Sequence, residues 1–193
     1  MLSTHKILPE SFTQAFCFVI IQGKIMDGKE RKILETIEKF SGKLPKFPDG
    51  RIDYSNSDIA PVIVIFIKYK DKIILLKRSN KVRTYQGKWN TVAGYLDEIR
   101  PINEKIFEEL REELKIDKSD ILSTRLGKSY TFKDTKVEIN KTWIIYPALV
   151  ELKNKPEIKL DWEHVEYQWI KPEELKNFDT PPNLNKSFDN LFK

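Results

Sequence analysis

Four carboxylates lie within two turns of one predicted helix, and they are the residues with the clearest chemical potential. The segment reads Glu108-Glu109-Leu110-Arg111-Glu112-Glu113-Leu114 and follows Gly94 by fourteen residues. Side chains three and four residues apart are neighbours on a helix, and like charges there repel one another. A divalent cation such as Mg²⁺ takes hard oxygen ligands from a few carboxylates together with substrate phosphates. The cluster therefore predicts a metal site.

The spacing of the apolar residues on this helix predicts which carboxylates are buried. At about 100° per residue, the apolar positions between residues 102 and 114 fall on one face. Glu113 lies inside that apolar stripe and Glu109 lies at its border, whereas Glu112 points away from it. An unpaired, partly buried charge costs several kcal/mol, which a bound cation would remove. The alternative is that the helix turns Glu113 outward at its end.

The hydrophobic pattern predicts the elements that position this helix. Short apolar runs indicate strands, a 3.6-residue period indicates helices, and Gly and Pro mark the breaks. Pro101 is expected at the first helical position, and Lys133-Asp134-Thr135 is expected to be a turn. The expected strands are 16–21, 62–69, 73–77, 89–94, 121–132, 136–152 and 166–170, and the expected helices begin near residues 28, 101, 172 and 184. Strands separated by one central helix predict an α/β (α+β) fold in which helices sandwich a mixed sheet.

The composition is that of a folded protein with a modest positive charge. The chain has 193 residues, of which 40% are hydrophobic and 33% charged, and its net charge is +5. We expect a strand-helix-linker appendage at residues 1–57 and a main domain at residues 58–193. Cys17, the only cysteine, reads as a buried small hydrophobe, and a chain without disulfides fits the cytoplasm. No apolar run is long enough to span a membrane, so no membrane partner is expected.

With these residues in view, the chain resembles the Nudix hydrolase family. The family motif is Gly, five residues, Glu, seven residues, Arg-Glu, an aliphatic residue, any residue, Glu-Glu, any residue, Gly and an aliphatic residue. Laid on this sequence without a gap, it is matched at Gly94, Glu109, Leu110, Glu112, Glu113 and Ile116. The resemblance covers roughly residues 59–175, including the approach 86–94 and the ending 163–175. It implies the Nudix α/β/α sandwich.

Three positions depart from the motif. Arg100 stands where the family has Glu, Glu108 where it has Arg, and Lys115 where it has Gly. The first two changes are opposite, so we expect Arg100 and Glu108 to form an ion pair in which the charges are exchanged. Glu108 cannot donate the hydrogen bond with which the family's arginine is thought to orient the neighbouring glutamate. Lys115 removes the residue that most easily adopts the left-handed conformation at a helix end.

The resemblance also implies roles for individual residues. Glu109, Glu112 and Glu113 would bind Mg²⁺ or Mn²⁺, with the backbone carbonyl of Ala93 as a further ligand. Glu109, and after it Glu163, is the candidate general base. The catalytic set is thus Glu109, Glu112 and Glu163. The residues expected to contact the substrate are Arg78, Arg83, Trp89, Gly94 and His164, although core packing is the ordinary role for Trp89. Tyr85, Tyr130 and Trp143 are further aromatic residues that could stack on a base.

The sequence therefore predicts a metal-dependent pyrophosphohydrolase that acts on a nucleoside diphosphate linked to another group. One alternative is a regulatory module that binds a nucleotide with little turnover, favoured by Glu108 and Ala93. Another is a hydrolase of RNA ends, for which the positive charge is the only support. The lysines are spread along the whole chain, so they do not indicate a dedicated nucleic-acid surface. The expected partner is a small nucleotide, and the sequence leaves a homodimer open.

Overall fold

The protein is described as a computed structural model that covers residues 20–21, 24–25, 27–136 and 139–192. Most of the strand predicted at residues 16–21, with Cys17, lies outside the described residues. Within them, β1 (Ile20–Ile21) pairs antiparallel with β2 (Lys24–Ile25). None of the helices in these ranges has the length and apolar character needed to cross a membrane.

The main sheet joins eight strands of the described residues in the order β10-β4-β3-β9-β7, with β5 beside β4, β6 beside β3 and β8 beside β9. The strands are β3 (Ile59–Tyr69), β4 (Lys72–Arg78), β5 (Trp89–Asn90), β6 (Val92–Tyr95), β7 (Ile121–Leu126), β8 (Tyr130–Asp134), β9 (Lys141–Leu152) and β10 (His164–Ile170). β3 and β9 run parallel, and the other pairs are antiparallel. The predicted hairpin of β3 and β4 and the mixed sheet are confirmed.

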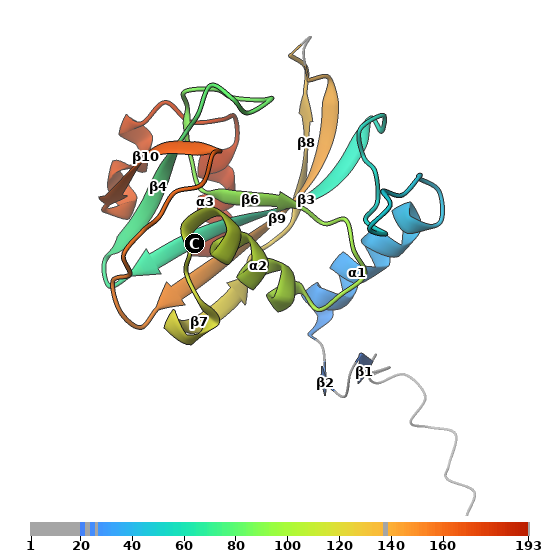
Figure 1. Cartoon of the computed structure of the whole chain (residues 1–193), viewed down its shortest axis with the longest axis horizontal. Coiled ribbons are helices and arrows are strands. Elements are labelled where there is room, and N and C mark those ends of the chain that lie inside the picture. The colour runs from blue at the N-terminus through green and yellow to red at the C-terminus, as the bar shows by residue number, and fades with distance from the viewer. Residues whose placement is uncertain (1–19, 22–23, 26, 137–138, 193) are drawn as a thin grey trace, which may run out of the picture.

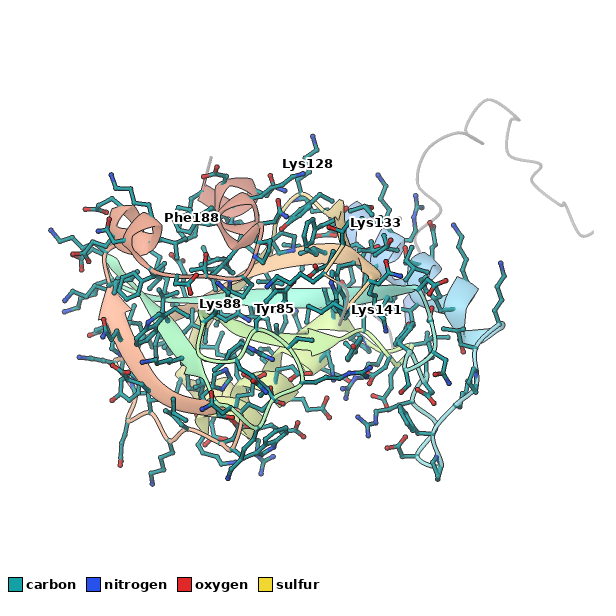
Figure 2. All side chains as sticks on the ribbon, turned by 90° about the horizontal axis from the view of Figure 1, so that it is seen from above. Tyr85, Lys88, Lys128, Lys133, Lys141 and Phe188 are labelled. Carbon is teal, nitrogen blue, oxygen red and sulfur yellow. The ribbon has the colours of Figure 1, made fainter. Side chains whose placement is uncertain are left out.

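Helices cover both faces of this sheet (Figures 1 and 2). They are α1 (Gly28–Ser41), α2 (Ile102–Leu114) and α3 (Leu184–Phe192), and short 3₁₀ turns occupy Lys118–Asp120 and Pro172–Asn177. One hydrophobic cluster lies between the sheet and α1 with α2, and a second lies between the sheet and α3. The alternating residues of β3 divide accordingly, since Ile63 and Ile65 belong to the first cluster and Phe66 to the second. The predicted α/β/α sandwich is confirmed.

Helix α1 shares its core with the rest of the protein. Asp27 caps it by accepting hydrogen bonds from the backbone N–H groups of Lys29 and Glu30. Its apolar face, including Ile33, is buried in the same cluster as α2. The carboxylate of Glu30 accepts a hydrogen bond of 3.1 Å from the backbone N–H of Ile102, the first residue of α2. Pro101 precedes α2 without a side-chain cap, so a side chain of α1 partly replaces that cap.

The long strand predicted at residues 121–132 is two strands in the structure. β7 pairs with the second half of β9 and β8 with its first half. Between them, Gly127 donates a backbone hydrogen bond to Pro147 in β9. A Cβ at Gly127 would lie 2.8 Å from the carbonyl oxygen of Asn190 in α3. The strand prediction was wrong because the hydrophobic pattern does not reveal that α3 presses against the chain here.

Helix α2 ends on a lysine in a strained conformation. Lys115 has φ 58° and ψ 31°, the left-handed region that L-residues enter at a cost of roughly 1–2 kcal/mol. We expect Lys115→Gly to raise the free energy of unfolding by about 1 kcal/mol, because glycine adopts this conformation freely. Urea unfolding measures the change, and Lys115→Ala, which keeps the strain, should give no such gain. Equal stability of the glycine and alanine variants would contradict this explanation.

Candidate active site

A cleft of about 600 Å³ opens beside α2, with one face of β3, β6, β8 and β9 as its floor. The carboxylates of Glu109, Glu112 and Glu163 line this cleft, together with Arg78 and Arg83. A second hollow of about 640 Å³ lies along the outer side of α2, but neither Glu109 nor Glu113 lines it. The predicted ligands Ala93, Glu109 and Glu112 therefore line the first cleft, whereas Glu113 is buried and is not among its lining residues.

Glu109 is held against the backbone of β6. It is 8% exposed, and its carboxylate lies over Gly94, where a Cβ would come within 2.0 Å of Glu109 Oε1. Only glycine leaves room for this contact, which gives a physical reason for the glycine of the motif. The predicted burial of Glu109 is confirmed, as is that of Glu113, and Glu112 is exposed.

Lys105, one turn before Glu109, places an ammonium group among the carboxylates. Its Nζ lies 2.7 Å from Glu109 Oε1, 3.3 Å from Glu108 Oε2 and 3.7 Å from Asp97 Oδ1. Burial lowers the pKa of Lys105, but the nearby carboxylates outweigh it, with Glu109 first, so the pKa is raised overall. For Glu109 the directions are opposite: burial raises the pKa of its carboxyl, and the charge of Lys105 lowers it, with burial the larger effect. Lys105 therefore acts as an internal counter-ion for this cluster.

Glu113 carries a buried charge with little compensation. It is 5% exposed, and its Oε2 has no hydrogen-bond partner among the described residues. Burial raises its pKa well above the ordinary value, the charges of Glu109, Glu163 and Asp161 raise it further, and the backbone N–H of Ala93 opposes them. A cation beside Glu113 would remove this cost.

Because the charge on Glu113 is costly to bury, removing that charge should raise the free energy of unfolding, and the increase should depend on pH. A carboxyl whose pKa is raised on folding costs stability as the pH rises from its ordinary value of 4.5 through the raised value. Glu113→Gln should therefore stabilise the metal-free protein by roughly 1–3 kcal/mol at alkaline pH and hardly at all near pH 4. Urea unfolding in EDTA across this range measures the difference. A gain that is independent of pH would show that packing, not charge, is responsible.

His164 lies behind Glu113, away from the cleft lining. Its Nδ1 is 3.7 Å from Glu113 Oε2 and 3.4 Å from Asp161 Oδ1, and the side chain is buried. Burial lowers the pKa of His164, the Asp161 carboxylate opposes this, and Arg78 lowers it further. The imidazole therefore favours its neutral form and offsets little of the charge on Glu113.

Arg78 ends β4, and Glu163 immediately precedes β10, the strand paired with β4, so both residues line the cleft from the same end of the sheet. Burial raises the pKa of Glu163, Arg78 lowers it, and Asp161 and Glu109 raise it. Burial lowers the pKa of Arg78, while the charge of Glu163 opposes that shift. The Nε of Arg78 donates to the carbonyl of Thr84 at 2.9 Å, which fixes the guanidinium at the base of the loop 79–88.

Arg100 and Glu108 are in contact. The two side chains form a bidentate ion pair, in which the Arg100 Nη1 to Glu108 Oε1 distance is 3.3 Å, and Arg100 Nε lies 3.0 Å from Glu98 Oε2. The guanidinium is buried enough that desolvation lowers the pKa of Arg100, yet the carboxylates raise it overall, Glu108 first. The pair links the loop before α2 to the helix itself.

A double-mutant cycle measures this link. We expect Arg100→Gln and Glu108→Gln to be coupled by roughly 0.5–1 kcal/mol in the free energy of unfolding, because the pair is partly exposed and bidentate. The coupling should shrink as salt is added, since salt screens such charges. Neutral variants are preferable to reversed charges because Lys105 lies 3.3 Å from Glu108 and would repel an arginine there. Additive losses would show that the contact contributes nothing.

The donor atoms of this region fit a hard divalent cation. Carboxylate oxygens are the ligands that magnesium and manganese prefer. Glu113 presents an oxygen without a partner, and the ammonium of Lys105 already places a positive charge beside Glu109. Within the described residues, no three acidic, histidine or cysteine side chains already converge on one point. The residues that would hold such a cation are Glu109, Glu112 and Glu113, whose negative charge it would neutralise.

The structure brings most of the predicted site residues to one cleft and leaves others outside it. The residues that line it are Arg78, Arg83, Ala93, Gly94, Glu109, Glu112 and Glu163. Trp89 instead packs edge-on against Phe178 at a ring distance of 5.3 Å, next to the α3 cluster. Sequence reasoning missed Lys105, although its i, i+4 spacing from Glu109 could have indicated the contact. It also missed Tyr54 and Tyr95, for which no local signal exists.

The NUDIX domain family model matches residues 58–191, more than two-thirds of the chain. With Gly94, Glu109, Glu112 and Glu113 placed as described, the chain belongs to the NUDIX domain family. It is accordingly a hydrolase that acts on pyrophosphate bonds. The family match extends beyond residue 175, where the sequence resemblance ended, to include nearly all of α3.

Several known proteins are similar to this chain. Nucleoside triphosphatase NudI of Escherichia coli O139:H28 is 25% identical in an alignment of 128 residues, and the match covers 61% of this chain and 86% of NudI. The MutT protein of Methanosarcina mazei Go1 superposes with a TM-score of 0.57 at 22% identity, over 69% of this chain and 93% of that one. An Ap4A hydrolase of C. elegans gives a TM-score of 0.53 at 17% identity, and the match covers 67% of this chain and 95% of that one. The solved structures support the fold.

A fourth similar protein is a bifunctional NMN adenylyltransferase/ADP ribose pyrophosphatase of Francisella tularensis, complexed with AMP and an Mn ion. Its TM-score is 0.52 at 16% identity, and the match covers 83% of this chain and 46% of that one.

Proposed function

We propose that this protein hydrolyses a phosphoanhydride bond in a nucleoside diphosphate linked to another group, and that it does so with Mg²⁺ or Mn²⁺. The observation that carries the proposal is the joint placement of Glu109, Glu112, Glu163 and Arg78 around one cleft. The names of the related nucleoside triphosphatase, Ap4A hydrolase and ADP ribose pyrophosphatase support a nucleotide substrate.

The chemistry follows from what each residue offers. Cleaving a phosphoanhydride requires neutralised phosphate charge, a water in line with the bond, and a base for its proton. A metal held by Glu109, Glu112 and Glu113, with the Ala93 carbonyl as a further ligand, would supply charge neutralisation and a more acidic water. Arg78 and Arg83 would bind phosphate oxygens.

Two cleft carboxylates can take the proton from water. Glu109 comes first because it lies beside the proposed metal and its position is fixed by Gly94 and Lys105. Glu163 comes second, and its raised pKa brings it closer to the range useful for a general base.

A nucleotide panel tests this function. Wild-type protein should release phosphate or a mononucleotide from at least one member of a panel of nucleoside triphosphates, dinucleoside polyphosphates and nucleoside diphosphate sugars when Mg²⁺ or Mn²⁺ is present. EDTA and the double variant Glu112→Gln/Glu113→Gln should each abolish release. Turnover that survives in EDTA would contradict the role of the metal.

The ion pair between Glu108 and Arg100 favours a second candidate, a nucleotide-binding module with little turnover. Glu108 is engaged with Arg100 and Lys105 and cannot donate a hydrogen bond to Glu109. Tight binding of one nucleotide without turnover of any panel member would favour this candidate. Cleavage confined to RNA ends and lost in moderate salt would instead indicate the RNA hydrolase, because phosphate contacts weaken with salt. We expect the protein to act in the cytoplasm, and a homodimer stays an open alternative.

A further inference from the structure

Three aromatic rings line the cleft just past the glycine that Glu109 contacts. The ring of Tyr95 stacks on Tyr54, with centroids 5.7 Å apart and 14° between the planes. Trp143 lies 6.0 Å from Tyr95 at a tilt of 45°. Tyr95 keeps 41% of its surface exposed, whereas Tyr54 keeps 3%. Tyr95 thus presents open aromatic surface to the cleft while Tyr54 supports it.

Polar contacts fix these supporting rings. The hydroxyl of Tyr54 donates to the carbonyl of Leu96 at 3.0 Å, and the carbonyl of Tyr54 accepts from Lys141 Nζ at 2.7 Å. The same Nζ lies 5.6 Å from the centroid of Trp143, and Figure 2 labels this lysine. Lys141 therefore joins Tyr54 to Trp143, and the rings are positioned before any ligand binds.

Part of this wall comes from outside the family match. Tyr54, Phe47 and Arg51 all line the cleft, yet they precede residue 58, where the match begins. The guanidinium of Arg51 lies 5.7 Å from the centroid of Phe47, whose ring is 40% exposed. The segment before the family domain thus contributes surface to the same cleft as the carboxylates.

We propose that Tyr95, backed by Tyr54 and Trp143, forms a subsite on which a planar nucleobase stacks while the attached phosphates extend toward Glu109. The proposal rests on the proposed function and adds the part of the substrate that the carboxylates do not recognise. Successive side chains of β6 point to opposite faces of the strand, but Gly94, Tyr95 and Glu109 all line the one cleft, so a ligand can contact the Tyr95 ring and reach Glu109 within it. In this proposal, residues 47–54 have the role of completing the base subsite.

The chemistry of the wall favours a nucleobase over a sugar. A flat, exposed aromatic ring gains most from another flat π-system, and every base offers such a face. Arg83, which lines the same cleft, adds a cation near the bound ring and its phosphates. Stacking alone discriminates little between bases, so purine and pyrimidine nucleotides should both bind.

Calorimetric titration of the full chain tests the subsite with ligands that have no phosphoanhydride bond. In the presence of Mg²⁺, wild-type protein should bind AMP and UMP at least about tenfold more tightly than ribose 5-phosphate. Tyr95→Leu should remove most of this preference, and Tyr95→Phe, which keeps the ring, should retain it. Tyr54→Leu should reduce it by a smaller factor, since Tyr54 acts by supporting Tyr95. Melting temperatures confirm that each variant is folded.

Tyr167→Leu is the matched control. Tyr167 is also 41% exposed, but it lies on β10 and does not line the cleft, so this variant should keep the wild-type preference. Equal binding of all three ligands by the wild type, or an undiminished preference in folded Tyr95→Leu, would overturn the subsite. Base preference without any phosphoanhydride cleavage would refute the proposed hydrolysis and leave the subsite standing. Phosphoanhydride cleavage without any preference for ligands that carry a base would support the proposed hydrolysis and refute the subsite.

Discussion

Replacing Glu109 with Gln is expected to lower kcat/KM on the preferred nucleotide by on the order of 10³-fold. The change removes the charge that would hold the metal and the first candidate for the general base. Gln keeps the size of the side chain, so the fit over Gly94 should persist. Steady-state kinetics and Mn²⁺ titration followed by electron paramagnetic resonance measure the two losses separately.

Glu104→Gln provides the control for this experiment. Glu104 lies in the first turn of the same helix and is exposed, so the variant removes one negative charge from α2 without touching the cleft. It should bind Mn²⁺ and turn over substrate as the wild type does. If Glu109→Gln retained more than about a tenth of the wild-type kcat/KM, Glu163 would become the leading candidate for the base, because typical general-base losses are larger.

Gly94→Ala is expected to lower kcat by roughly 10²-fold, although it adds only one methyl group. The new Cβ would come within 2.0 Å of Glu109 Oε1, so the carboxylate must move, and a displacement of about 1 Å at a reacting group can cost this much. The contact is with a side chain, so the fold should survive. Circular dichroism and the melting temperature check the fold, and steady-state kinetics check the loss.

Gly28→Ala is the matched control for the methyl group. A Cβ at Gly28 would meet no atom within 4 Å, and the residue begins α1. This variant should keep full activity and the wild-type fold. A Gly94→Ala enzyme with wild-type kcat would mean that Glu109 can shift without consequence, and the positioning argument would be wrong.

The sequence was informative where a local pattern determines the structure. The 3.6-residue period of α2 placed Glu109 and Glu113 on the buried side and Glu112 outside, and the structure agrees. Arg100 and Glu108 depart from the family motif with opposite charges, which indicated that the two side chains form a pair, and they are in contact. The β3–β4 hairpin was found from the local pattern, because two apolar runs flank the short polar stretch 70–72.

Contacts between distant segments were not predictable from one sequence. Tyr95 meets Trp143 because β3 pairs with both β6 and β9, and Tyr54 reaches Tyr95 from the segment before β3; no spacing rule connects residues so far apart. The break at Gly127 depends on α3, which is more than fifty residues later. The hydrogen bond between Glu30 and Ile102 likewise joins elements that the sequence placed in different parts of the molecule.

That last hydrogen bond means that the stretch recognisable by family likeness and the unit that folds cooperatively need not begin at the same residue. The helix that bears Glu109 receives its first N-terminal acceptor from Glu30, twenty-eight residues upstream of position 58. Trimming the protein to its recognisable domain would leave that amide without its acceptor and uncover the face where Ile33 packs. Fraying would then start at Ile102, about two turns of α2 before Glu109, and as it spreads along the helix it would loosen the candidate catalytic carboxylates, so a trimmed enzyme should lose activity before it loses its overall shape.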